Sequence, residues 1–217
     1  MPSPEFKRMS TQIAQLAGYL LPRSFSPTGT YRYHKREAAR TLAYRLMVHA
    51  EFEHYLETRS VAVALRAWKE FQNRGCVTHC ALALLAFSQG KRLELPNSIT
   101  CPNVQQQPEW ESKLMLRRRL KAALDWYRDA VYKTNHGIRE ANVLAVLLPI
   151  GLDPDELDPL WLTSLDQFGR SRGLAAHKSL SIQSLTATVD PATERDLVVK
   201  QLLPGWEVVD TLLDKLV

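Results

Sequence analysis

Two arginines and a histidine occur close together in the segment FGRSRGLAAHKS, residues 168–179. They are Arg170, Arg172 and His177. A histidine with a pKa near neutrality can move protons to and from ribose oxygens, and an arginine can hold the charged phosphorane formed during RNA cleavage. This chemistry needs no metal ion. The segment therefore predicts a candidate site for metal-independent cleavage of RNA.

The spacing of Arg172 and His177 limits how one chain could use both. The two positions are about 140° apart around an ideal helix, so one helix does not aim both side chains at one point. Gly169 can end the preceding helix, and Ser171 has the residue type of an N-cap for a following one. A site using both side chains fits better if a second copy of the motif supplies the complement, or if the helix begins only after Arg172.

A histidine and a glutamate lie in the apolar stripe of a predicted helix that contains VHAEFEHYL. Five side chains fall within roughly 80° of each other, at 100° per residue: Leu42, Leu46, His49, Glu53 and Leu56. Burying a charge without a partner is costly, so His49 and Glu53 must pair with each other or with an approaching group. Two interpretations remain open. The two side chains form a hydrogen-bonded pair in the core, or they orient a catalytic group on another segment. His54, on the flank, is expected to be exposed.

A basic run, KLMLRRRLK, covers residues 113–121. Three consecutive arginines on a helix fan over about 200°, so they do not form one flat patch. Arg118 and Lys121 share one outward side, and Arg117 borders the face expected to pack into the core. The run is either solvated surface or a contact for a phosphate backbone. The net charge of +5 and the pI near 9.2 are compatible with a polyanionic partner but do not show one.

The segment CVTHC places two thiols one helical turn apart, with a histidine beside the second. The residues are Cys76, His79 and Cys80. A structural zinc site needs four ligands, usually in two paired clusters, and Cys101 is the only other cysteine. We therefore expect buried free thiols and no metal ion, with a metal-dependent helical enzyme as the competing hypothesis. Three cysteines do not make a disulfide framework, which indicates a reducing cytoplasm.

Hydrophobic periodicity predicts an all-α protein. Helices are expected at residues 10–21, 33–58, 61–73, 76–87, 109–133, 139–148 and 154–168, followed by two helical segments split or kinked at Pro204 and Gly205. Gly75 should end the helix over residues 61–73. Residues 90–108 are expected to form the longest irregular connection. We expect residues 1–30 to be a tail with a first short helix, and residues 31–217 to be one helical domain. No apolar run is long enough to span a membrane.

The motif and its surroundings resemble a known family. RGLAAHKS, late in an all-α chain, is similar to the signature of the HEPN domains (higher eukaryotes and prokaryotes nucleotide-binding), an arginine followed some residues later by a histidine. NHGIREANVLAVLLPIGLD and LDPLWLTSLDQFGRSRGLAAH resemble the bacterial stand-alone subgroup of the RiboL-PSP type, and AEFEHYLETR resembles its aromatic–Glu–x–Tyr helix. The similarity covers residues 31–216, and residues 135–179 are its specific part.

The resemblance implies a helical bundle that dimerises so that two Arg–His motifs meet in one cleft. Many such domains are metal-independent endoribonucleases in toxin–antitoxin or anti-phage defence systems. The resemblance gives Arg172 and His177 the catalytic roles and places Glu53 toward the active face. For this chemistry we expect His49, Glu53, Arg170 and Ser179 to support the site. The candidates for binding RNA are Arg117, Arg118, Lys121 and Lys178. The implied partners are RNA, a second copy of the chain and a cognate antitoxin or defence protein, and no cofactor is expected.

Two positions depart from the family pattern. Gly173 follows the arginine where many active members have Asn, Asp or His, and Ser179 replaces a tyrosine found in one toxin subgroup. The alternative function is therefore an inactive HEPN module that binds a nucleotide, RNA or a partner protein.

Overall fold

The computed structural model describes residues 1–25, 35–88, 98–101, 103–107, 115–177 and 190–217. For Lys35 and residues 171–177 it describes the backbone alone. Within these ranges the regular structure is helical and no strand occurs, which confirms the predicted all-α class. None of the described helices is both long enough and apolar enough to cross a membrane.

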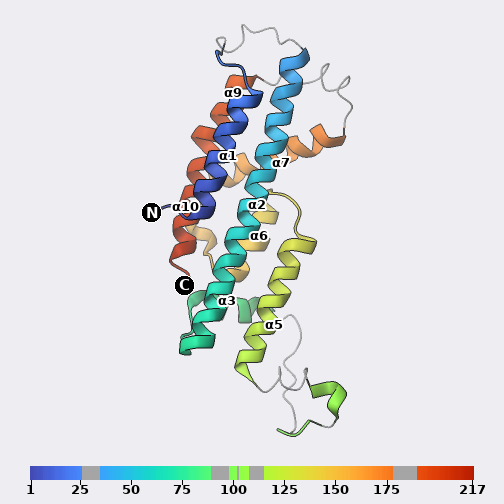
Figure 1. The fold of residues 1–217 in the computed structure, drawn as a ribbon, viewed down its shortest axis with the longest axis vertical. Helices are drawn as coiled ribbons and strands as arrows, with labels where there is room; N and C mark the ends of the chain where they lie inside the picture. The colour runs from blue at the N-terminus through green and yellow to red at the C-terminus, as the bar shows by residue number, and fades with distance from the viewer. Residues whose placement is uncertain (26–34, 89–97, 102, 108–114, 178–189) are drawn as a thin grey trace. The chain divides into compact units, whose positions relative to one another are not determined.

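The helical elements follow one another along the chain as labelled in Figure 1. They are α1 (Pro4–Leu20), α2 (Lys35–Arg74), α3 (His79–Ser88), η1 (Val104–Gln106), α5 (Leu116–Asp129), η2 (Ala130–Thr134), α6 (Glu140–Leu147), η3 (Leu148–Ile150), η4 (Pro154–Glu156), α7 (Pro159–His177), α9 (Pro191–Asp196), η5 (Leu197–Leu202) and α10 (Leu203–Asp214). Two of them, η2 and η5, are π-helical.

The chain divides into two compact units. Unit 1 comprises Met1–Leu56, Gly137–Val143 and Asp155–Thr211, and unit 2 comprises Glu57–His136, Leu144–Pro154 and Leu212–Val217. The long helix α2 contributes its first half to unit 1 and its second half to unit 2.

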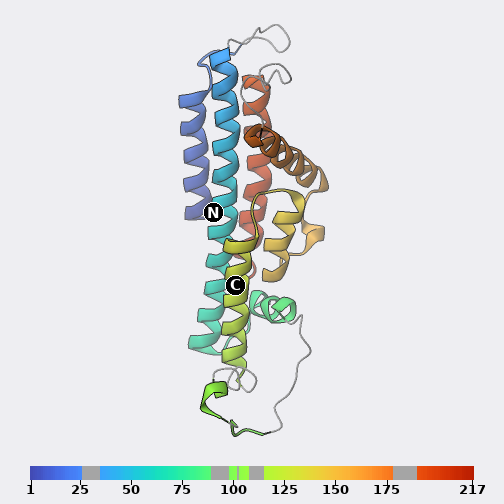
Figure 2. The same ribbon diagram turned by 90° about the vertical axis from the view of Figure 1, so that its right-hand side faces the viewer.

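In unit 1, α1 lies beside the first half of α2 and α10, as the views in Figures 1 and 2 agree. The buried carboxylate of Asp210 accepts hydrogen bonds from the Ser3 amide (2.7 Å), the Ser3 hydroxyl (2.6 Å) and the Tyr55 hydroxyl (2.9 Å). The indole of Trp206 packs at the centre of the aromatic core, with ring centroids 5.7 Å from Phe52 and 5.1 Å from Trp161. This core holds α2, α7 and α10 together.

In unit 2, α3 packs against α5 and the short η3 turn. The fully buried Tyr127 donates its hydroxyl to the Val146 carbonyl at 2.9 Å, which satisfies the phenol in an apolar setting. Arg59, 5% exposed, forms an ion pair with Asp214 at 2.5 Å. These contacts join α5 to α6, and the second half of α2 to the C-terminal residues of this unit.

The first helix begins earlier than its predicted bounds of 10–21. Ser3 is the N-cap, and its hydroxyl accepts a hydrogen bond from the Phe6 amide at 3.1 Å. Pro4 stands at the first helical position, where a missing N–H costs nothing. Phe6 and Met9 are buried, so the residues ahead of position 10 pack into unit 1.

The break predicted between residues 58 and 61 does not occur. Helix α2 runs unbroken through Thr58, Ser60 and Val61 to Arg74. β-Branched residues and serine lower helix propensity only slightly, and burial of Ser60 and Val61 offsets that small cost. The predicted stop at Gly75 is confirmed, since this glycine adopts a left-handed φ of 69° directly after the helix.

The other two predicted interruptions are also absent. Helix α7 continues through Gly169 to His177, so Gly169 does not end it and Ser171 is not an N-cap. The chain also stays helical through Pro204, and the irregularity is the π-helical η5 just before it. Proline has no N–H to donate, and the Leu203 amide bonds the Val198 carbonyl in the longer π register.

Candidate functional site

The Arg–His motif lies on one continuous helix. The backbone of α7 is helical from Pro159 to His177, so positions 172 and 177 are about 140° apart around a single helix. The hypothesis that a new helix begins after Arg172 is therefore wrong. The side chains of Arg172 and His177 lie outside the described part of the structure, as do Lys178, predicted to bind RNA, and Ser179, predicted to support the site.

His49 and Glu53 approach each other as their i, i+4 spacing predicts. His49 is 2% exposed, and its Nδ1 lies 3.7 Å from Oε2 of Glu53. That distance is an electrostatic contact and exceeds the usual hydrogen-bond length. The second carboxylate oxygen of Glu53 accepts a hydrogen bond from the Gly137 amide. The glutamate thus joins α2 to a turn 84 residues away in the chain. His54 is exposed, as predicted.

Gly137 fits this place because of its conformation and its neighbours. Its φ of 113° is one that L residues rarely adopt. A Cβ at this position would lie 3.7 Å from Oδ1 of Asn142 and 3.8 Å from Cε1 of His49. In the turn formed by the sequence NHG, the backbone of Gly137 therefore lies close to the His49 ring, and the Gly137 amide donates a hydrogen bond to Glu53.

The same histidine contacts α7. Its ring stacks on Phe168 with centroids 6.3 Å apart and planes inclined by 19°. Phe52 meets Phe168 edge to face, with centroids 6.2 Å apart. Phe168 is 1% exposed. The two residues of α2 thus hold α7 at a position one turn ahead of Arg172.

A carboxylate that the sequence analysis missed binds two arginines on the surface of α7. One oxygen of Asp166 accepts from Nε of Arg139 at 3.0 Å, and the other accepts from Nε of Arg170 at 2.5 Å. Burial alone would raise the pKa of Asp166, but the hydrogen bonds and positive charges of the two arginines outweigh it and lower the pKa below its usual value. We call Asp166, Arg139 and Arg170 the arginine clamp.

Gly169 permits the clamp. A Cβ on this residue would lie 2.8 Å from Cγ of Arg139 and 3.5 Å from its amide nitrogen. The aliphatic stem of Arg139 therefore crosses α7 directly over the glycine. Spacing in the sequence could have shown the Asp166–Arg170 pair, which is i, i+4 on one helix. It could not have shown Arg139, which is 27 residues from Asp166.

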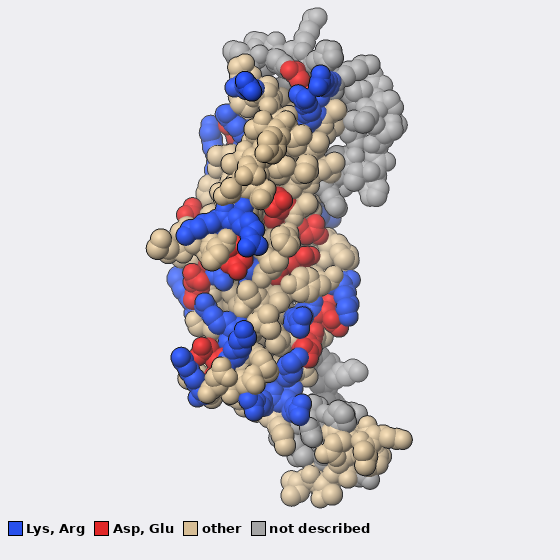
Figure 3. All heavy atoms as spheres, viewed as in Figure 1, with Lys and Arg blue, Asp and Glu red and all other residues tan. Residues whose placement is uncertain are grey.

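The basic run on α5 belongs to unit 2, whereas α7 belongs to unit 1. Arg117 is exposed and donates to the Gln72 carbonyl at 3.4 Å, and Arg118 is exposed. Lys121 forms an i, i+4 ion pair with Asp125. On the face drawn in Figure 3, basic and acidic side chains of the described residues are interspersed. Arg117 and Arg118 thus lie at the surface, as both interpretations of the run expect.

The cysteine segment also lies in unit 2. Cys80 is fully buried, and this burial raises the pKa of its thiol to about 12, although Arg66 acts in the opposite direction. Cys76 is exposed, contrary to the prediction of a buried thiol. Nε2 of His79 lies 2.9 Å from the Gly151 carbonyl oxygen. Among the described residues, no three His, Cys, Asp or Glu side chains come together as metal ligands.

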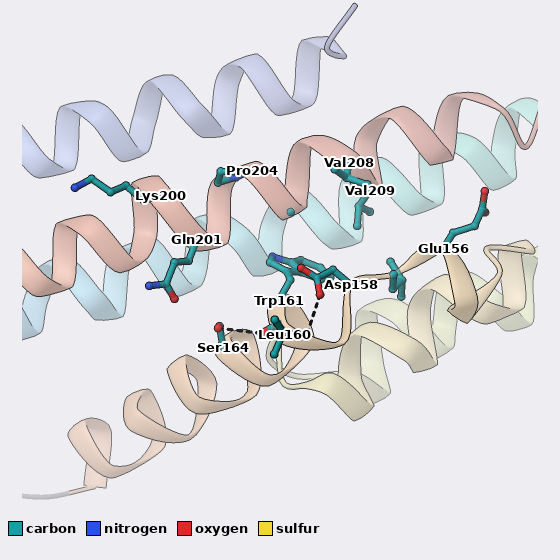
Figure 4. Close-up of a pocket in the computed structure, with 12 residues that line it drawn as sticks. Glu156, Asp158, Leu160, Trp161, Ser164, Lys200, Gln201, Pro204, Val208 and Val209 are labelled. Carbon is teal, nitrogen blue, oxygen red and sulfur yellow. Dashed lines mark hydrogen bonds between the residues drawn. The ribbon is translucent and has the colours of Figure 1, made fainter.

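Unit 1 also has a groove of about 490 Å³ between α7 and the segment from η5 to α10 (Figure 4). Its lining is largely apolar and includes Trp161, Pro204 and Val209, together with the charged residues Asp158 and Lys200. Nε1 of Trp161 donates to the Leu202 carbonyl at 3.1 Å, so the indole is held in place. Among the predicted site residues whose side chains the structure describes, none lines this groove.

Comparison with known proteins gives no relative: no family model matches the chain, and no curated protein or solved structure matches it.

Proposed function

We propose that the chain is a metal-independent endoribonuclease of the HEPN type that acts as a homodimer in a bacterial toxin–antitoxin or anti-phage defence setting. His177 moves protons and Arg172 holds the phosphate that is cut. Glu53 and His49 support α7 from the side of α2.

The observation that carries the proposal is the meeting of three segments that the sequence resemblance singled out separately. Glu53 of α2 accepts the Gly137 amide of the NHG turn, and His49 of α2 stacks on Phe168 of α7. The contacts among these three segments support the proposal. These contacts lie within unit 1, beside the helix that carries the motif.

The continuous helix supports a site shared by two copies. Positions 172 and 177 lie about 140° apart around the backbone of α7, so one helix does not bring both positions to one side. A second copy that brings its own α7 alongside would set the histidine of one chain near the arginine of the other. Gly173 has no polar side chain at the position where many active HEPN domains have one. In the proposed dimer, Arg172 and His177 would therefore be the main reactive groups of the shared site.

In the proposed reaction, the ribose 2′ oxygen attacks the adjacent phosphorus and gives up its proton to a general base. The bond from phosphorus to the 5′ oxygen breaks, and the departing oxygen takes a proton. The products are a 2′,3′-cyclic phosphate and a 5′ hydroxyl. His177 serves these proton transfers, and Arg172 balances the charge on the phosphorane oxygens. In-line attack needs a flexible backbone, so single-stranded RNA or a loop is the expected substrate.

The alternative is a binding module that uses the same fold without cleavage. Gly173, where active members often have a polar residue, is the observation that favours it.

The test is incubation of the purified protein with total RNA in excess chelator, followed by mapping of the cut ends. We expect cleavage that leaves cyclic phosphates and that drops by at least about a hundredfold in His177→Ala, the usual size of a general acid–base contribution. His54→Ala is the matched control, because this histidine is exposed on α2. Cleavage that is equal in His177→Ala and in the wild type would refute the nuclease proposal.

A further inference from the structure

The arginine clamp has a geometry that suits binding of an anion outside the protein. Each arginine uses its Nε–H, the inner edge of the guanidinium group, to bond Asp166. The side chain of Asp166 is 18% exposed, whereas those of Arg139 and Arg170 are 49% and 65% exposed. The carboxylate is therefore the inner anchor, and the two guanidinium groups are the outer, solvent-facing layer.

The terminal N–H groups of the two guanidinium groups are not used by Asp166. A guanidinium group carries five N–H donors in a fixed fork, and Asp166 takes one from each arginine. Within the described part of the chain, the terminal nitrogens of Arg139 and Arg170 form no hydrogen bond. Paired N–H groups in such a fork match the oxygens of a phosphate group, which arginine binds in a bidentate manner.

The clamp is held in place before any ligand arrives. One carboxylate fixes both Nε atoms, and the stem of Arg139 lies across α7 in the space that Gly169 leaves free. Long side chains lose rotamer freedom when they bind a ligand, so arginines that are already restrained lose less. The clamp carries a net charge of +1, from two guanidinium groups and one carboxylate. This charge and these donors suit a phosphodiester.

The position of the clamp relates it to the proposed cleavage site. Arg170 is seven residues, nearly two turns, ahead of position 177, so the two positions share one face of α7 about 10 Å apart along the helix axis. A strand of nucleic acid that runs along α7 past position 177 would therefore present a neighbouring phosphate to the clamp.

We propose that Arg139 and Arg170, held by Asp166, form a subsite for an RNA backbone phosphate next to the one that is cut. This inference rests on the proposed function for its choice of ligand. It assigns a role to Arg139 and Asp166, and it gives Arg170 a flanking phosphate as its ligand. It also explains why a glycine interrupts the helix surface at position 169.

The test measures binding of a fluorescein-labelled, fully 2′-O-methylated single-stranded RNA as a function of salt concentration. This RNA has no free 2′ hydroxyl and is not cut, so binding is measured independently of catalysis. Loss of one phosphate contact reduces the slope of log K against log salt by about 0.7, and lowers affinity about fivefold for each tenfold step below 1 M salt. We expect this change in Arg139→Gln and in Arg170→Gln, and about twice this change in the double variant.

Two further variants distinguish phosphate binding from a structural role. Arg8→Gln removes the same charge from an exposed position on α1 of the same unit, and it should leave the slope unchanged. Arg139→Lys keeps the positive charge and should keep the wild-type slope. If Arg139→Gln and Arg170→Gln keep the wild-type slope, or if Arg139→Lys loses as much slope as Arg139→Gln, the subsite is refuted.

The outcome is separable from that of the nuclease test. If the slope of log K against log salt is reduced in the arginine variants and RNA cleavage is unchanged in His177→Ala, the phosphate subsite is supported and the nuclease proposal is refuted. Cleavage that depends on His177 together with unchanged slopes would do the reverse. Failure of the wild-type protein to bind the methylated RNA at low salt would overturn the subsite directly.

Discussion

The polar cluster of unit 1 and the basic run of unit 2 are built in different ways. In unit 1, Glu53, Asp166 and their partners come from three separate segments, and each carboxylate binds groups that lie far along the chain. In unit 2, Lys121 pairs with a carboxylate on its own helix, one turn away. A contact between distant segments depends on the fold, whereas an i, i+4 pair forms on almost any helix. The cluster of unit 1 is therefore the better candidate for a functional site.

The largest effect should come from removing the carboxylate that joins α2 to the NHG turn. Glu53→Ala leaves the buried Gly137 amide without its acceptor, which costs about 2 kcal/mol of unfolding free energy. Lys121→Ala breaks only an exposed i, i+4 pair and should cost less than about 0.5 kcal/mol. Urea titrations of both variants measure the difference. If both variants lose the same unfolding free energy, the contacts in unit 1 stabilise the fold no more than the exposed ion pair in unit 2.

Glu53→Gln sharpens the same comparison. The amide oxygen of glutamine can still accept the Gly137 N–H, so this variant should recover most of the stability that Glu53→Ala loses. If the glutamine variant is as unstable as the alanine variant, then the charge of the carboxylate and not the hydrogen bond holds the turn.

A smaller effect, of opposite sign at two sites, should follow from replacing helical glycines. Gly169→Ala places a Cβ 2.8 Å from Cγ of Arg139, so the stem of this arginine must move. We expect a net loss of about 1 kcal/mol, because this overpacking costs more than alanine gains in helix propensity. A Cβ added at Gly18 of α1 would have no neighbouring atom within 4 Å. Gly18→Ala should therefore stabilise the protein by about 0.5 kcal/mol, because alanine has the higher helix propensity. Melting temperatures of the two variants should shift in opposite directions. A stabilised Gly169→Ala would show that Arg139 yields easily and that the clamp is loosely held.

Sequence patterns predicted the helical elements well and their ends less well. The period of apolar residues placed α2, α5, α6 and α7 close to their observed positions. The breaks predicted at Gly169, at Pro204 and between residues 58 and 61 were wrong, and the first helix begins ahead of its predicted start at residue 10. At Gly169 the reason for the glycine is a neighbouring side chain, which only the folded structure shows.

The candidate site was predictable to the extent that its members share a helix. His49 and Glu53 are four residues apart, so their approach followed from helix geometry. The hydrogen bond from Gly137 to Glu53 and the bond from Arg139 to Asp166 each join distant segments. Periodicity carries no information on such contacts. The resemblance to the HEPN family pointed to these segments, but it did not name Asp166 or Arg139.

The central claim is that two chains share one cleavage site, and mixed dimers test it most directly. Purified Arg172→Ala and His177→Ala proteins are each assayed on total RNA in chelator, then mixed, allowed to exchange subunits and assayed again. If the site takes its arginine from one chain and its histidine from the other, the mixed dimer contains one intact site and cleavage reappears. If subunit exchange is demonstrated and the mixture stays as inactive as either variant alone, the shared site is contradicted.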